Sequence, residues 1–248
     1  MAKADEYRAK LRTLDKWDAY LLKNSGLPGP RGNLELAQVV ADEGDLRLFR
    51  RYTAYTADIA PVNSPYEFLA FCGVVGLGRL FAEGNLDLLP TLRSHASDPR
   101  WRIREAVAMA LQRLGDADMT RLITAMHAWS KGTPLEQRAA AAALCEPRLL
   151  GQAKHAGAVL DILDGITLSI ERMEHRQNDD FRTLRKGLAY CWSVAVVALP
   201  TEGKILMEKW LLNSDKDIRW IMKENLRKAR LTRMDSNWVR KWCESLGN

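Results

Sequence analysis

The sequence lacks the segments that place a protein in or across a membrane. The apolar run Cys191 to Pro200 is about half of the roughly 20 residues that a membrane helix needs. Residues 1–11 are charged and helical in pattern, without the apolar core of a signal peptide. We therefore expect a soluble, cytoplasmic protein that does not bind a membrane.

Patterns for metal, cofactor or disulfide chemistry are also absent. The four cysteines form no Cys-x-x-Cys pair, and the four histidines stand alone in the chain. In a reducing compartment such cysteines are most simply small buried hydrophobic residues. The sequence therefore predicts no metal site and no cofactor, and it leaves any catalytic residue unknown. The residues concerned are Cys72, Cys145, Cys191, Cys243, His95, His127, His155 and His175.

One glycine-rich run, residues 73–79, superficially resembles a phosphate-binding loop. It does not follow a strand, and it lacks the Lys-Ser/Thr pair of such a loop. We interpret these glycines as positions where helices pack closely.

Strand formers are sparse, whereas Ala, Leu, Arg, Glu and Lys recur, and this composition favours helix. Apolar residues repeat at helical spacing along the chain, punctuated by Gly, Pro, Asn and Asp. The predicted fold is all-α, in a single domain over residues 1–248, because no shift in composition marks a boundary. Helices are expected over residues 3–23, 34–43, 45–58, 66–81, 118–131, 134–145, 147–176, 179–199, 201–212, 215–229 and 235–245, with two more beginning near Asn85 and Asp98.

An internal repeat supports a helical array. Residues 98–107 and 217–226, which lie 119 positions apart, share the pattern D-x-R-W-x-Φ-[RK]-E-x-Φ, where Φ is apolar. In each copy the Asp is expected to cap a helix by accepting a backbone N–H. Weaker copies give aligned basic positions 34, 47 and 38 residues apart, which fits a solenoid of roughly 40-residue units. These aligned positions are Arg104, Arg138, Arg185 and Lys223.

Residues 97–116, SDPRWRIREAVAMALQRLGD, resemble the HEAT repeat, whose signature is D-P-x-x-x-Φ-R-x-x-A-x-x-A-L. The resemblance implies a right-handed α-solenoid of about five to six HEAT-like helical pairs. It also implies a structural ladder of repeated Asp and Arg between neighbouring units, here Asp98, Arg104, Arg138 and Lys223. The residues that carry the resemblance are Asp98, Pro99, Ile103, Arg104, Val107, Ala110 and Leu111.

In size, fold and charge the chain is also similar to the bacterial HEAT-type glycosylases that remove alkylated bases from DNA. This weaker similarity implies a concave face that holds duplex DNA with aromatic side chains and a carboxylate. If it applies, the stacking residue would be Trp101, Trp192 or Trp220, and the carboxylate would be Asp98, Asp179 or Asp180.

Tryptophan and basic residues offer two interpretations each. Trp101 and Trp220 occupy the same repeat position beside arginines, and they either fill the space between helix pairs or lie on the concave surface, where they suit nucleic acid. Residues 219–241 hold eight basic and two acidic residues, so the whole net charge of +6 is local to this stretch. The basic side chains of this stretch either form a solvated face or bind a polyanion. Lys223, Arg227 and Arg230 share one helical stripe if the helix predicted from residue 215 extends as far as Arg230.

These observations favour a non-enzymatic HEAT-like scaffold that binds a macromolecular partner through its concave surface. The alternative is a DNA-binding protein related to the alkyl-base glycosylases, with or without that activity. The partner is accordingly a protein or a nucleic acid, with duplex DNA as the nucleic-acid candidate. The candidate binding residues are Arg100, Trp101, Arg102, Arg219, Trp220, Lys223, Arg227 and Arg230.

Overall fold

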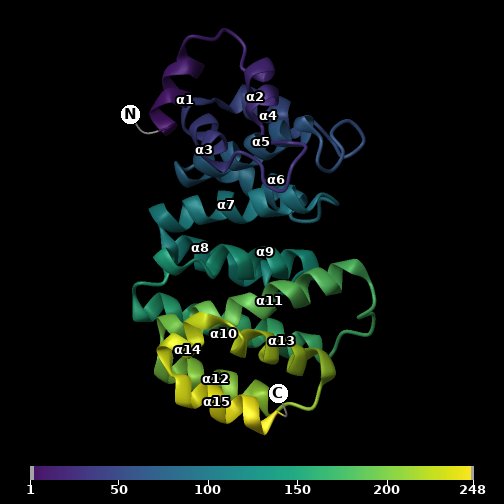
Figure 1. The fold of residues 1–248 in the computed structure, drawn as a ribbon. Helices are drawn as coiled ribbons and strands as arrows, with labels where there is room; N and C mark the ends of the chain where they lie inside the picture. Colours follow the sequence, from purple (N-terminus) through teal and green to yellow (C-terminus); the bar gives the residue numbers. More distant parts are fainter. Residues whose placement is uncertain (1–2, 247–248) are drawn as a thin grey trace. The chain divides into compact units, whose positions relative to one another are not determined.

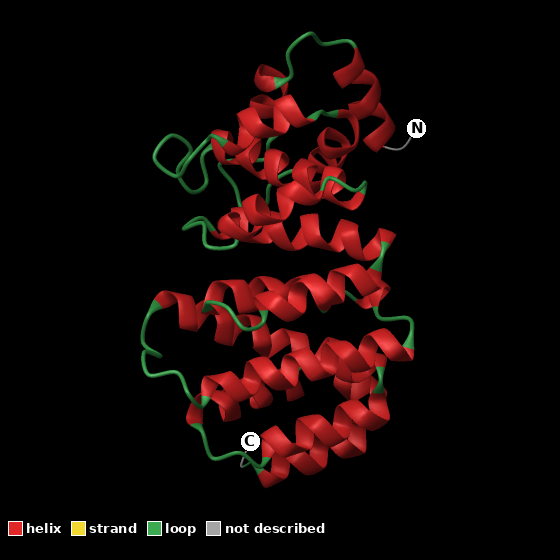
Figure 2. Ribbon diagram, turned by 180° about the vertical axis from the view of Figure 1, so that it is seen from behind, coloured by secondary structure: helices red, strands yellow, loops and turns green. Residues whose placement is uncertain are grey.

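Helices and the loops that join them make up the whole of residues 3–246, the part of the chain that the computed structural model describes (Figures 1 and 2). Within these residues there are fifteen α-helices, two short 3-10 helices and no strand. The all-α prediction is therefore confirmed. The described residues form two compact units, which divide between Ala117 and Asp118.

The first unit is built around one apolar helix, α5 (Figure 1). This helix packs against α2, α3, α4, α6 and α7. It is the one helix of residues 3–246 that is long and apolar enough to cross a membrane, and 72% of it is buried inside the structure. The helices of the unit are α1 (Lys3–Arg12), α2 (Asp18–Asn24), α3 (Leu34–Glu43), α4 (Leu46–Thr53), α5 (Pro65–Ala82), η1 (Leu86–Leu88), α6 (Leu89–His95) and α7 (Trp101–Ala117).

Glycines let the neighbours of α5 approach its backbone. A Cβ atom added at Gly78 would lie 2.3 Å from the Cα of Ala110 in α7, and one added at Gly76 would lie 2.3 Å from the Phe49 ring in α4. No real Cβ tolerates such distances, so these two positions require glycine. The interpretation of the glycine-rich run as a helix-packing feature is confirmed.

The second unit consists of helices that contact one another in two series. Helices α8, α10 and α12 contact in that order, and so do α9, α11 and α13. Helix α11 also contacts α10, α12 and α14, which makes it the central helix of this unit. The helices are α8 (Met119–Trp129), α9 (Pro134–Leu144), η2 (Pro147–Leu149), α10 (Ala153–Ile170), α11 (Asp179–Ala198), α12 (Pro200–Leu211), α13 (Lys216–Leu226), α14 (Ala229–Met234) and α15 (Ser236–Ser245).

Side-chain caps explain where many of the helices begin. In each case a side-chain oxygen accepts a backbone N–H from the first turn, which would otherwise have no partner. Thr133 does so within a full capping box, in which the Glu136 side chain bonds back to the Thr133 N–H. The capping residues are Asn33, Asp45, Ser64, Asp118, Thr133, Asn178, Asp215 and Asp235.

The single helix predicted over residues 3–23 is wrong. The chain leaves the helix after Arg12 and resumes it at Asp18. The Trp17 indole N–H donates to the Leu11 carbonyl at 3.0 Å, and the Thr13 hydroxyl donates to the Lys10 carbonyl at 2.8 Å. These side chains satisfy carbonyls that a continuing helix would have used, so α1 ends there.

Two other predicted helices are shorter than expected. The helix from residue 45 ends at Thr53, and the helix expected from residue 147 begins at Ala153, after the 3-10 turn η2. The helix predicted over residues 215–229 ends earlier, at Leu226, and the short helix α14 that follows was not predicted. The cap of α13 is Asp215, whereas Asp217, the predicted cap, lies in the first turn and is buried.

Candidate macromolecule-binding surface

Arg100, a predicted binding residue, is buried at the start of α7. Only 2% of it is exposed, and its guanidinium bonds both oxygens of the Asp98 carboxylate at 2.9 and 2.7 Å. It also donates to the carbonyls of Tyr55 and Ala60, at 2.8 and 3.1 Å. Arg100 therefore fastens the loop after α4 to the start of α7 and offers no free guanidinium to a partner.

Arg102 is buried as well, and it holds a second loop. Its guanidinium pairs with the Glu67 carboxylate at 3.1 Å and donates to the Gly29 carbonyl at 2.7 Å. Trp101, between the two arginines, is 48% exposed, and the Arg102 guanidinium stacks on its ring at 4.4 Å. Of the three predicted residues in this motif, only Trp101 presents a surface to a partner.

In the second copy of the motif, over residues 217–226, the Asp and the Trp contact an arginine of another helix. Asp217 accepts a hydrogen bond from Arg185 of α11 at 2.6 Å, and the Arg185 guanidinium lies 4.4 Å from the Trp220 ring. This ion pair joins α11 to α13. In the first copy, by contrast, Asp98 pairs with Arg100 of its own segment, and Arg104 donates to the Asp98 carbonyl.

Helix α13 holds three of the predicted binding residues, and a fourth, Arg227, is its C-cap residue. Arg219, Lys223 and Arg227 are four residues apart and Trp220 is three residues before Lys223, so they lie on one side. The opposite face is buried, and it includes Ile218, Ile221, Met222, Asn225 and Leu226. The Asp215 cap fixes where the helix begins and so sets which residues face outward.

The sequence places Arg230 on the same stripe as Lys223 and Arg227 only if the helix extends that far, and it does not. The helix ends at Leu226, so Arg230 lies on α14. There its guanidinium stacks on the Tyr190 ring of α11 at 4.4 Å and donates to the Tyr190 hydroxyl at 2.5 Å. Arg230 is thus attached to α11 rather than to the outward face of α13.

Helix α11 adds exposed residues that the sequence analysis missed. Arg182, Lys186 and Tyr190 are spaced four residues apart and are exposed. The sequence could have indicated them, because they lie on the polar face of the helix predicted over residues 179–199. Arg185 of α11 lies over the Trp220 ring of α13, and Arg230 of α14 lies over the Tyr190 ring of α11, so basic and aromatic residues of three helices meet. We call this surface the basic face, and it comprises Arg182, Arg185, Lys186, Tyr190, Arg219, Trp220, Lys223, Arg227 and Arg230.

The basic face keeps unpaired positive charge. Asp179 pairs with Arg182 at 3.0 Å, and Glu224 pairs with Arg227 at 2.5 Å. Lys223 donates to the Leu246 carbonyl at 2.9 Å. Lys186 and Arg219 make no side-chain hydrogen bond or ion pair within residues 3–246, so both are available to an external anion.

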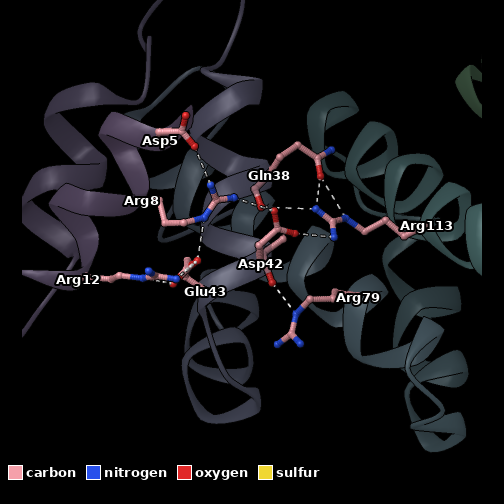
Figure 3. A network of polar contacts seen from close by, with 9 residues as sticks. Asp5, Arg8, Arg12, Gln38, Asp42, Glu43, Arg79 and Arg113 are labelled. Carbon is pink, nitrogen blue, oxygen red and sulfur yellow. Dashed lines mark hydrogen bonds and ion pairs between the residues drawn. The ribbon is translucent and has the colours of Figure 1, made fainter. Parts of the chain in front are cut away.

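Another group of arginines, in the first unit, is engaged within the protein (Figure 3). Arg8 and Arg12 of α1 pair with Glu43 at 2.9 and 2.8 Å, and Arg113 of α7 pairs with Asp42 at 2.9 Å. Arg113 also donates to the Gln38 side chain. Arg79 of α5 donates to the Ala41 and Gly44 carbonyls at the end of α3. This network ties α3 to α1, α5 and α7, which is a structural role.

No three His, Cys, Asp or Glu side chains gather within residues 3–246 in a way that could hold a metal ion. Burial raises the pKa of the Cys72 and Cys145 thiols well above the ordinary value, which keeps them protonated.

The stacking residues of the glycosylase resemblance are partly unavailable. Trp192 is wholly buried, and its indole N–H donates to the Thr167 hydroxyl at 3.0 Å, so it offers no face to a base. Both oxygens of Asp98 are engaged by Arg100, whereas Asp179 and Asp180 are exposed at the start of α11. No protein-family model and no curated protein matches this chain.

Proposed function

We propose that this protein is a non-enzymatic HEAT-like repeat scaffold that binds a macromolecular partner through its concave surface. The HEAT-like segment at residues 97–116 and the ordered contacts α8–α10–α12 and α9–α11–α13 support this proposal. The proposed architecture is a right-handed solenoid of about five to six helical pairs, with the basic face on its concave side.

The basic face is the observation that carries the proposal. It combines unpaired cations, Lys186 and Arg219, with two aromatic rings that each have a guanidinium stacked 4.4 Å away. Such stacking holds the two arginines in place. Arg185 is also ion-paired with Asp217, whereas Arg230 has no carboxylate partner among the described residues. A rigid, positively charged surface suits a partner that is itself anionic, and we propose that this partner is a protein with an acidic surface.

Duplex DNA is the second candidate partner. Cations interleaved with aromatic rings, here Trp220 and Tyr190, also suit the phosphate backbone of a duplex. This candidate retains the DNA-binding part of the glycosylase resemblance. We propose it without base removal, since two of the residues that the resemblance names for that activity, Trp192 and Asp98, are respectively buried and bound by Arg100.

Fluorescence anisotropy with labelled duplex DNA and labelled poly-glutamate, at about 50 and 200 mM salt, tests both candidates. We expect binding that weakens with salt, because each neutralised charge releases counterions. The variant Lys186→Gln/Arg219→Gln removes the two unpaired cations without touching the core, and it should weaken binding severalfold. The matched control, Arg47→Gln/Arg50→Gln, removes the same charge from exposed positions of α4.

The outcomes separate the partners. Preference for poly-glutamate supports the acidic protein, and preference for DNA supports the second candidate. Binding of neither polymer at the lower salt would overturn the assignment of the basic face, as would equal losses in the two double variants.

A further inference from the structure

A pocket of about 300 Å³ opens beside Trp101 in the first unit. Its walls are mostly apolar and come from the loop after α2 and from α3, α5 and α7. Phe68 and Phe71 lie nearly parallel, with ring centroids 6.5 Å apart, and both are buried. Trp101 and Leu34, at 48% and 47% exposure, leave apolar surface open at the same pocket. Mostly apolar, concave pockets of this size are typical small-molecule sites.

The pocket is held in place before any ligand arrives. The Arg102 guanidinium stacks on Trp101 and is itself fixed by Glu67. Its second bond, to the Gly29 carbonyl, ties the loop over residues 26–32 to α7. The Gly29 N–H in turn donates to the Asn63 side-chain oxygen at 3.0 Å. A ligand would therefore lose little free energy in ordering these walls.

Two features of the pocket favour an anion over a cation. Arg31 lines it, is exposed, and makes no side-chain hydrogen bond or ion pair within residues 3–246. Arg102 also lines it, and its Nε–H is buried without an acceptor. Glu105, the one carboxylate of the lining, already interacts within the protein. The unused polar groups are thus a cation and a hydrogen-bond donor.

We infer that this pocket binds a small aromatic anion, with the ring between Trp101 and the Phe68–Phe71 pair and the anionic group toward Arg31. Aromatic walls favour a planar ring, since ring pairs gain beyond their area of contact. The inference concerns the first unit and does not depend on the basic face.

Isothermal titration calorimetry with 2-naphthoate tests the inference on the full chain. We expect a Kd of about 1 mM or tighter for a ligand of this size. The neutral analogue 2-naphthamide should bind about two- to fivefold more weakly, and this difference should vanish in Arg31→Gln, because an exposed ion pair contributes that much. Cyclohexanecarboxylate, which has the charge without the ring, should bind more weakly than 2-naphthoate.

Two matched pairs of variants control for unrelated effects. Leu34→Trp should block the pocket and weaken binding about tenfold or more, whereas Leu86→Trp, at an exposed leucine outside the pocket, should not. Arg50→Gln should retain the preference for the carboxylate that Arg31→Gln loses. Absence of binding to the folded protein, equal binding of naphthoate and naphthamide, or equal effects of the two tryptophan substitutions would each overturn the inference.

Discussion

A buried ion pair, between Glu67 and Arg102, holds the start of α7. Glu67 has no exposed surface, and Arg102 is its one ion-pair partner among the described residues. The pair is also tied to the backbone, because the Glu67 carboxylate accepts the Asn63 N–H at 2.7 Å. Removing one member of such a pair leaves the other charge buried and uncompensated, which is far more costly than losing an exposed charge.

We therefore expect Arg102→Met to lower the free energy of unfolding by about 3–5 kcal/mol in urea denaturation. Arg50→Met, at an exposed position, should change it by no more than about 0.5 kcal/mol. The double variant Glu67→Gln/Arg102→Met should recover part of the loss, because no charge then remains buried. If Arg102→Met were as mild as Arg50→Met, the ion pair would not have the role described.

At the scale of helices, the Asp215 cap determines how α13 is presented. Its carboxylate accepts the N–H groups of Asp217 and Ile218 and pairs with Arg176 at 2.5 Å. Burial raises the pKa of Asp215, but the Arg176 contact and the two backbone N–H groups outweigh it, so the pKa is lower than in a free carboxyl. The charged form is thus the one that stabilises the helix start.

Asp215→Asn keeps a capping oxygen and removes the charge. At pH 7 it should lower the free energy of unfolding by about 1 kcal/mol. Because the folded pKa is depressed, this contribution is complete above the unfolded pKa of about 3.9 and is lost as the pH falls through the lower folded pKa. Urea denaturation of both proteins at pH 7 and pH 3 checks this. A difference independent of pH would contradict the role of the charge.

Helix packing around α5 makes a second prediction at this scale. Gly78→Ala places a Cβ against Ala110 and should destabilise the protein by about 1–3 kcal/mol through overpacking. The same substitution at Gly165 in α10, where an added Cβ meets nothing within 4 Å, should stabilise it by about 0.5–1 kcal/mol. Thermal unfolding of the two variants compares them directly. A stabilising Gly78→Ala would show that α5 and α7 do not pack this closely.

For the whole molecule, the position of the charge matters more than its total. The net charge is +6, yet the arginines of Figure 3 are engaged by acidic side chains and by carbonyls, whereas Lys186 and Arg219 on the basic face are not. The affinity for an anionic polymer should therefore depend on which basic residue is replaced, even when the net charge changes equally.

If DNA is the partner, Arg219→Gln should make the slope of log K against log salt concentration less steep by about 0.9. Arg47→Gln changes the net charge equally and should leave the slope as it is. Anisotropy titrations at several salt concentrations measure both slopes. Equal changes would mean that net charge, and not the basic face, governs binding.

The sequence by itself determined most of the helices, because their caps are local. Asn33, Asp45 and Asp118 each bond a backbone N–H within three residues, so their effect can be seen in the order of residues alone. The break after Arg12 was not predictable in this way, since apolar spacing continues across it. The division of the described residues into two compact units was not visible in composition either.

Only the tertiary structure decided which basic residues are available to a partner. Arg100 and Arg219 occupy the same position of the repeated motif, yet Arg100 is buried and Arg219 is exposed. The reason is where each helix begins. Helix α7 starts at Trp101, after Arg100, which therefore reaches back to the carbonyls of the preceding loop. Helix α13 starts at Lys216, so Arg219 already lies within it, on the side opposite the core.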